Sequence, residues 1–427
     1  MGQKGIHIEA LRRTRGEMSE AKEVSSTDVK VGNESVAIRT FSLSANGVTV
    51  QVCNVGASIC KILVPNYVSD EDEGVDDVVL GYKSAVDMYT SRNPTYLAVI
   101  VGRVANRIAK GRLSVDGKDY AVATNNGSNH LHGGEDGFSH RIWDAEIIDG
   151  SGVQFTLVSQ DGDQNYPGTV EVKATYSLVP QGEKGATLKL DMEGKLLDDK
   201  SSPLSLAQHS YFNLAGHSHG TGILDHKVTM PCEAYTPVDS TSIPTREVRS
   251  LNDDSAMDWR LGRMVRDALI DFGTQKAGLS EDEVQSHFNL SRRGPHLAKA
   301  GTNCSNPNEP YGFDHNYVVL KNEQEILNVV GTVEHAESGR RLTVLTDAPG
   351  VQLYTANWLD GSNQEISKDS TAYGQWQGLC FETQTYPDGI IENEAEHPAF
   401  AGGKCFILRK GGPDYKHRVE YRFDPIS

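Results

Sequence analysis

VEVKATYSLVPQGEKGATLKLDM, residues 170–192, is the stretch that decides the fold. Apolar residues occupy every second position on both sides of a Pro-Gln-Gly turn: Val170, Val172, Ala174, Tyr176 and Leu178, then Leu188, Leu190 and Met192. Because successive side chains of a strand point to opposite faces of a sheet, this alternation predicts half-buried antiparallel strands.

Similar strand-like runs lie on both sides of this stretch. They fall at residues 48–53, 153–157, 326–333, 342–346, 351–355, 405–408 and 417–423. Turns rich in glycine separate them, and the chain contains 42 glycines. No long amphipathic helices alternate with the strands, so a parallel sheet is not expected. The sequence predicts an all-β fold: one large antiparallel β-sandwich with short helices in its loops.

The domain organisation follows from where the alternation starts and stops. Residues 1–33 are polar and charged without a sustained apolar period, so we expect an N-terminal tail. Residues 34–427 are expected to form the sandwich. Residues 261–310 are polar and irregular, with helical possibilities at 263–272 and 280–288, and are interpreted as an insertion on the surface of the sandwich.

Charge and composition narrow the classes of partner. Lys and Arg number 41 against 58 Asp and Glu, a formal net charge of -17, which argues against nucleic acid and anionic membrane surfaces. No apolar run is long enough to span a bilayer, and the N-terminus lacks the apolar core of a signal peptide. Six scattered cysteines favour a reduced, cytoplasmic protein. A small neutral substrate fits best.

The first polar cluster is NNGSNHLHGG, residues 125–134. Asn-Gly and Gly-Gly mark turns, and a histidine between them is held on a loop where its ring can face a cavity. His132 is the stronger candidate for such a role. The alternative is that His130 and His132 are ordinary turn residues on the surface.

Two charged residues are candidates for holding a polyhydroxylated ligand. Arg107 offers a planar fork of donors to neighbouring hydroxyl groups, with a structural salt bridge as its alternative. Asp314, in Tyr311-Gly-Phe-Asp-His-Asn316, offers a carboxylate beside aromatic residues, which suits a polyhydroxylated ring. Its alternative is a turn that opens the next strand.

His209 lies in PLSLAQHSYFNL, residues 203–214. If this segment is a strand, Ser205, Ala207 and His209 share one face, and the small neighbours leave space in front of the imidazole. An imidazole gives or takes a proton near neutral pH, which suits a general acid. The alternative is a hydrogen-bonded core histidine.

Glu382 is expected in a similar setting. In QWQGLCFETQ, residues 375–384, alternation places Trp376, Gly378, Cys380 and Glu382 on one face. The small neighbours Gly378 and Cys380 would then leave space in front of the carboxylate, a position that suits a general base. The alternative is a buried carboxylate in a structural hydrogen-bond network.

A metal site and a nucleotide site are both disfavoured. His130 and His132, or His217 and His219, could join a carboxylate in a nitrogen and oxygen site, but both pairs lie in turns rather than on strands. No phosphate-binding glycine loop is present. We therefore expect neither a metal nor a cofactor.

Seven blocks, in this order, resemble the aldose 1-epimerase (galactose mutarotase) family. They are Gly102-Arg-Val-Ala-Asn-Arg-Ile108, Asn129-His-Leu-His-Gly-Gly134, Asp161-Gly-Asp-Gln-Asn-Tyr-Pro-Gly168, His209-Ser-Tyr-Phe-Asn-Leu-Ala-Gly216, Tyr235-Thr-Pro-Val-Asp239, Tyr311-Gly-Phe-Asp-His315 and Phe381-Glu-Thr-Gln-Thr-Tyr-Pro-Asp388. The resemblance implies a β-sandwich that interconverts the α and β anomers of free aldohexoses without a cofactor, as a monomer or homodimer.

The resemblance also implies roles for individual residues. Glu382 corresponds to the general base and His209 to the general acid, although the choice between His209 and His132 as proton donor stays open at this point. The residues that correspond to the family's sugar-binding positions are Arg107, His132, Asp314 and Asn106.

Two alternatives remain open. One is a non-catalytic sugar-binding protein on the same sandwich. The other is a hexose-6-phosphate 1-epimerase, which requires a basic phosphate pocket; Arg246, Arg260 and Arg263 are available for it, but the negative net charge disfavours it.

Overall fold

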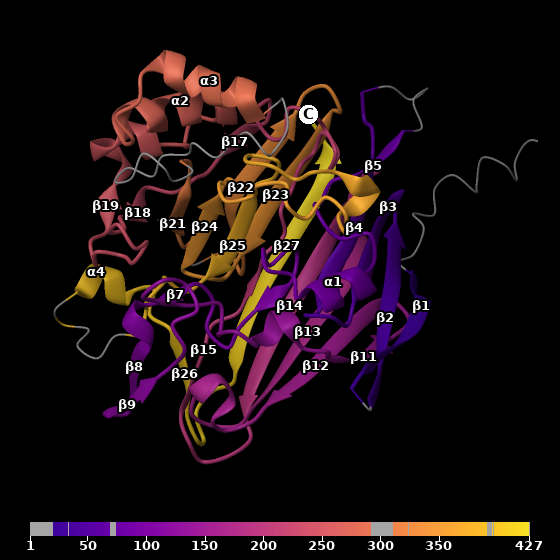
Figure 1. Ribbon diagram of the computed structural model, residues 1–427, viewed down its shortest axis with the longest axis vertical. Coiled ribbons are helices and arrows are strands. Elements are labelled where there is room, and N and C mark those ends of the chain that lie inside the picture. The colour runs from indigo at the N-terminus through magenta and orange to yellow at the C-terminus, as the bar shows by residue number, and fades with distance from the viewer. Residues whose placement is uncertain are drawn as a thin grey trace, which may run out of the picture.

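The computed structural model describes residues 20–32, 34–68, 74–291, 311–322, 324–390, 395 and 397–426. Within them, nine strands form the largest sheet, which runs through the middle of the molecule (Figure 1). In sheet order these strands are β11 (Asp144–Ile148), β12 (Gly152–Ser159), β13 (Val170–Pro180), β14 (Ala186–Leu196), β27 (Tyr415–Pro425), β23 (Arg340–Thr346), β22 (Asn328–His335), β17 (Lys227–Thr229) and β20 (Arg263–Met264). The stretch quoted first is the β13–β14 hairpin, with Tyr176 opposite Leu190.

A five-stranded antiparallel sheet packs on the β11–β14 end of the large sheet. Its strands, in order, are β1 (Glu20–Val31), β2 (Glu34–Ala45), β3 (Val48–Cys53), β4 (Ser58–Pro65) and β5 (Val75–Asp77). The rings of Phe41 and Phe155 meet edge to face at 6.0 Å, and the Tyr176 hydroxyl donates a hydrogen bond to the Ala57 carbonyl. Because these side chains are fully buried, the hydrophobic core lies between the two sheets.

A second five-stranded sheet carries much of the polar sequence singled out above. Its strands, in order, are β19 (Arg249–Ser250), β18 (Ala234–Thr236), β21 (Asp314–Val318), β24 (Gly350–Tyr354) and β25 (Cys380–Gln384). Short ladders complete the described strands: β6 (Ile100–Val101) with β16 (Ala207–Gln208), β7 (Arg107–Ile108) with β10 (His130–Leu131), β8 (Arg112–Val115) with β9 (Lys118–Ala121), and β15 (Ser202–Leu204) with β26 (Phe406–Leu408).

The helices are short and lie in connections between strands. They are α1 (Ala85–Ser91), α2 (Val265–Gln275), α3 (Glu281–Ser291) and α4 (Pro398–Ala401). Helices α2 and α3 fall in the segment interpreted as an insertion and pack together at one end of the molecule (Figure 1). Phe272 of α2 packs on Phe313, with ring centres 4.9 Å apart. Residues 292–310 of that segment lie outside the described residues.

The structure differs from the expected tail at residues 20–31. These residues form β1, which pairs along its length with β2, for example Ala21 with Leu43 and Val29 with Val36. Most of its side chains are exposed, and Glu23 forms an ion pair with Arg39 at 2.7 Å. Because the strand is held by backbone hydrogen bonds rather than by an apolar face, its sequence lacks the alternation from which a strand is predicted.

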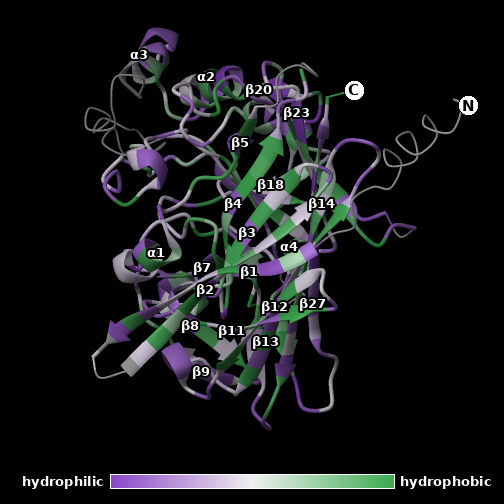
Figure 2. Cartoon of the chain, turned by 90° about the vertical axis from the view of Figure 1, so that its right-hand side faces the viewer, coloured by the Kyte–Doolittle hydropathy of each residue, from purple (hydrophilic) through white to green (hydrophobic). Residues whose placement is uncertain are grey.

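The predicted fold class is confirmed: the described chain is a large antiparallel β-sandwich with short helices in its loops. Hydrophobic and hydrophilic segments alternate along many of the strands (Figure 2). None of the helices within the described ranges is both long and apolar enough to cross a bilayer.

Candidate active site

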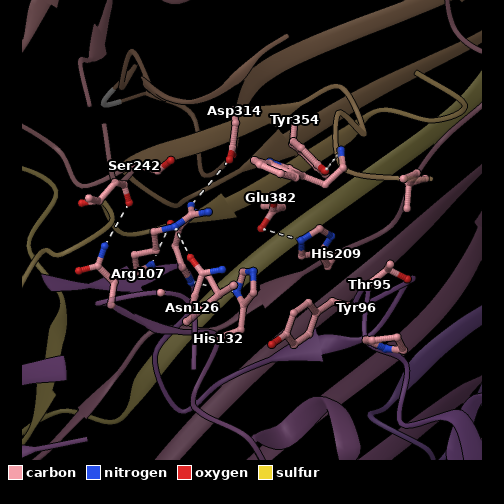
Figure 3. A pocket seen from close by; sticks show the side chains of 18 of the residues that line it. Thr95, Tyr96, Arg107, Asn126, His132, His209, Ser242, Asp314, Tyr354 and Glu382 are labelled. Carbon is pink, nitrogen blue, oxygen red and sulfur yellow. Dashed lines mark hydrogen bonds and ion pairs between the residues drawn. The ribbon is translucent and has the colours of Figure 1, made fainter. Parts of the chain in front are cut away.

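Side chains from several separate strands and loops line one cavity of about 550 Å³ (Figure 3). Its lining residues are Pro94, Thr95, Tyr96, Asn106, Arg107, Asn126, Gly127, Ser128, Asn129, Leu131, His132, His209, Tyr211, Ser240, Thr241, Ser242, Asp314, Tyr354, Trp358, Leu359 and Glu382. All six residues proposed from the sequence as site residues are among them. The volume is within the range of small-molecule sites.

Glu382 and His209 meet at the buried part of this cavity. Glu382 lies in β25, and His209 directly follows β16. The His209 backbone is paired on both sides, because its N–H donates to Val99 and its carbonyl accepts from Ala98. The distance from Glu382 Oε2 to His209 Nε2 is 3.5 Å, and only 2% and 4% of the two residues is exposed. An acid and a base thus face each other almost without solvent.

The strand faces predicted around these two residues are shorter than expected. β15 ends at Leu204 and β16 contains only Ala207 and Gln208, so His209 stands just outside a strand. β25 begins at Cys380; Trp376 precedes it with a left-handed backbone, φ 59°. The space in front of the imidazole is partly filled by the Cys380 sulfur, 3.7 Å from His209 Nδ1. Backbone turns interrupt the alternation from which the longer faces were predicted.

Burial controls the protonation of the pair. Loss of solvent, with the charge of Asp314, raises the pKa of the Glu382 carboxyl well above its usual value, and Arg107 opposes this more weakly. Burial lowers the pKa of His209 to about 4. Burial therefore favours a pair that holds one proton, on the carboxyl and opposite a neutral imidazole. The charge-separated form has the same number of protons.

A backbone N–H from another segment of the chain holds His132 in one tautomer. His132 has a left-handed backbone, φ 50°, and its Nδ1 accepts a hydrogen bond from the backbone N–H of Asn106 at 3.1 Å. Burial, His209 and Arg107 lower the pKa of His132 well below its usual value. The neutral ring must then carry its proton on Nε2. His132 can therefore donate a hydrogen bond to a ligand while remaining uncharged.

Arg107 and Asp314 form a polar wall beside Glu382 (Figure 3). Arg107 Nη1 lies 3.7 Å from Asp314 Oδ2, and Arg107 Nε donates to Asn126 Oδ1 at 3.1 Å. Gln352 Nε2 donates to the other oxygen of Asp314 at 2.7 Å. Both charged groups are only partly buried, so they can exchange some of these contacts for the hydroxyl groups of a ligand.

Asn106 lines the cavity but mainly shapes its own turn. Its backbone is left-handed, φ 61°, and its side-chain Oδ1 accepts a hydrogen bond from the backbone N–H of Arg107. Together with the bond to His132, this fixes the relative positions of two of the proposed sugar-binding residues.

Sequence reasoning did not identify Gln352, Asn126 or Tyr96 as site residues. Gln352 lies directly opposite Glu382 in the β24–β25 ladder, and the alternation of residues 351–355 was a usable signal for it. Asn126 lies in the NNGSNHLHGG motif, residues 125–134. Tyr96 lies in a loop with a left-handed backbone, and its ring centre is 4.6 Å from that of His132.

The two pairs of histidines considered for a metal do not fit one. His130 uses both ring nitrogens, toward the Ala123 carbonyl and the Tyr166 hydroxyl. His217 does the same, toward Asp369 and the Tyr373 hydroxyl.

Another group comes closer to metal-binding geometry in the part of the chain that the structure describes. The ligand atoms of His132, His209 and Glu382 lie within 4.8 Å of one another. The Nδ1 lone pair of His132, however, already accepts the Asn106 N–H, so Nε2 carries the proton. The donor set therefore fits hydrogen bonding to a ligand better than metal coordination.

The chain is similar to known proteins in both sequence and fold. The family model described as aldose 1-epimerase matches residues 39–422. Galactose mutarotase of Rattus norvegicus is 34% identical over 91% of this chain and 94% of its own length. Aldose 1-epimerase of Escherichia coli K12 is 28% identical over 90% of this chain and 95% of its own length.

Solved structures show the same fold. A C. elegans aldose epimerase homologue covers 94% of this chain and all of its own, with a TM-score of 0.70 at 22% identity. The match to galactose 1-epimerase from Lactobacillus acidophilus NCFM covers 95% of this chain and 98% of that structure, with a TM-score of 0.66 at 22% identity.

Proposed function

Because the chain belongs to the aldose 1-epimerase family, we propose that it is an isomerase that interconverts the α and β anomers of free aldohexoses such as glucose and galactose. The observation that carries the proposal is the buried contact of 3.5 Å between Glu382 and His209 inside a cavity of monosaccharide-binding size. An acid and a base in that arrangement can act on the two oxygens of one anomeric carbon.

The reaction is a transfer of two protons. Glu382, as carboxylate, accepts the proton of the anomeric hydroxyl, while His209, as imidazolium, donates a proton to the ring oxygen and the C1–O5 bond breaks. Rotation about C1–C2 then presents the other face of the aldehyde, and closure with the roles reversed gives the other anomer. Ring opening leaves a neutral carboxyl and a neutral imidazole, the form that burial favours. The site thus stabilises the open-chain intermediate relative to the charge-separated state.

The tautomer of His132 supports His209 as the proton donor. A neutral His132 with its proton on Nε2 could act as an acid only by becoming an imidazolate, which is strongly unfavourable. His209 instead exchanges its proton with Glu382. His132 is assigned a hydrogen bond to a sugar oxygen.

The polar wall gives the sugar its orientation. Arg107 donates to neighbouring hydroxyl groups, and Asp314, held by Gln352, accepts from hydroxyl groups on the same side. Asn106 shapes the turn that presents Arg107. Fixed positioning of this kind adds to the acid and base effect.

Neither alternative function gains support from the geometry. Arg246, Arg260 and Arg263 are each ion-paired with an aspartate and do not line the cavity, so they form no phosphate pocket there. A non-catalytic binding protein has no need for an acid and a base in contact at the buried part of its site.

Cellular setting and assembly belong to the same proposal. Cys53, Cys60, Cys232, Cys380 and Cys405 are free thiols in the described chain, which fits a reducing compartment such as the cytoplasm. The six proposed site residues line a cavity of one chain, and we propose a monomer or a homodimer.

Polarimetry tests the function directly. Freshly dissolved α-D-galactose or α-D-glucose should approach its equilibrium rotation faster with the protein than without it, and the final rotation should be the same. Glucose 6-phosphate under identical conditions separates the sugar-phosphate alternative. Sugar binding without any acceleration of mutarotation would contradict the proposal and support the binding protein.

A further inference from the structure

Trp358 differs from every other tryptophan in this chain. The chain contains four, and Trp143, Trp259 and Trp376 are at most 1% exposed. Trp358 is 54% exposed and lines the cavity that contains Glu382. A large apolar side chain kept in solvent within a polar cavity has no role in the hydrophobic core, so its position calls for a ligand.

The turn that carries Trp358 is held firmly. The Trp358 backbone N–H donates to the Tyr354 hydroxyl at 3.0 Å, and Leu359 N–H donates to the Ala356 carbonyl. The neighbouring Asn357 donates from Nδ2 to the Phe313 carbonyl at 2.9 Å. Because Phe313 immediately precedes Asp314, the turn is tied to the strand that supplies the carboxylate of the polar wall. The indole is therefore attached to a preorganised backbone.

We infer that Trp358 is a substrate-contacting residue whose indole packs against a C–H face of the bound aldose. A pyranose ring presents hydroxyl groups at its edge and C–H groups on its faces, so it needs both polar partners and an apolar surface. Arg107, Asp314 and His132 supply the polar partners, and the exposed indole supplies the apolar surface. The inference rests on the proposed function in taking an aldose as the ligand.

Such a contact has a particular value during ring opening. Hydrogen bonds are directional and match one geometry of the sugar, whereas an apolar contact tolerates changes in shape. While C1 turns about C2, an indole against the remainder of the sugar keeps the open-chain aldehyde in the cavity. Since the contact is made with ring and chain alike, it lowers KM more than it raises kcat.

Steady-state kinetics is the first test. In Trp358→Ala, KM for galactose should rise about tenfold with kcat within about threefold of the wild type, as expected for loss of uniform binding. Trp358→Phe should recover most of the loss, because it restores an aromatic face. Leu261→Ala is the matched control, since Leu261 is 94% exposed and does not line the cavity; its KM should equal that of the wild type.

Fluorescence gives a readout that does not require activity. Acrylamide should quench Trp358 before the three buried tryptophans, and Trp358→Phe should remove that accessible component. Galactose should protect Trp358 from the quencher in the wild type and equally in Glu382→Gln, which retains the cavity. If galactose protects Trp358 but mutarotation is not accelerated, the proposed function fails and the contact stands. Absence of protection, or a wild-type KM in Trp358→Ala, overturns the inference.

Discussion

Replacement of Glu382 by glutamine is the sharpest test of the proposed chemistry. The change preserves size and hydrogen-bonding shape at a residue that is 2% exposed, so the cavity should remain intact. It removes the base that accepts the anomeric proton. A positioned general base contributes about 10² to 10⁴ in rate. The nearest alternative, Asp314, is engaged with Arg107 and Gln352.

The structure places the expected loss near the upper end of that range. The shared proton of the pair resides on Glu382 or His209, and glutamine cannot hold it. With a pKa of about 4, His209 is then neutral at pH 7 and cannot act as the acid either. One substitution therefore removes both proton-transfer groups, and kcat should fall about 10⁴-fold, or about 5 kcal/mol in activation free energy.

The assay is polarimetry of fresh α-D-galactose, with the spontaneous rate subtracted. An unchanged melting temperature and protection of Trp358 by galactose show that the variant is folded and binds. Retention of more than about a tenth of the wild-type kcat would refute the reasoning, because even the lowest contribution of a general base exceeds that factor. The proton transfer would then have to be assigned to another group.

Three further outcomes are expected. Arg107→Lys should raise KM about tenfold with a smaller effect on kcat, because an ammonium cannot reproduce the planar fork; an unchanged KM in polarimetry would contradict this. The rate should fall on the acid side near pH 4, because His209 then takes up a second proton. It should also fall on the alkaline side at the raised pKa of Glu382, because the pair then loses its only proton. A flat pH–rate profile from pH 3 to 10 would contradict the shared proton. The free energy of unfolding should decrease as pH falls from about 6.5 toward 4, because burial lowers the pKa values of His315 and His417 to about 4 and the unfolded chain therefore binds protons first. Each contributes up to about 1.4 kcal/mol per pH unit across that window, and a melting temperature that rises on acidification would exclude this.

Local patterns were sufficient for the fold class and for most of the residues of the candidate site. The alternation in residues 170–192 predicted the β13–β14 hairpin because a half-buried strand must place its apolar side chains on one face. The ordered motifs around Arg107, His132, His209, Asp314 and Glu382 predicted one sugar site, and all five line a single cavity.

Other features left no local signal. Strand β1 is stabilised by backbone pairing with β2, and an exposed strand needs no apolar periodicity. Trp358 has the same chemical identity as three core tryptophans, and only its accessibility distinguishes it. For Gln352 the alternation of residues 351–355 indicated a strand, but its position opposite Glu382 depends on how β24 pairs with β25.

The sequence by itself determined the antiparallel sandwich and the identities of the polar groups, because side-chain periodicity and residue chemistry are local properties. Only the tertiary structure decided the surroundings that shift their pKa values. Glu382 and His209 are 173 positions apart, and it is their shared burial that raises one pKa, lowers the other and leaves one proton between them. The Asn106 N–H likewise selected the tautomer of His132. Solvent exclusion and hydrogen-bond direction arise only when distant segments pack together.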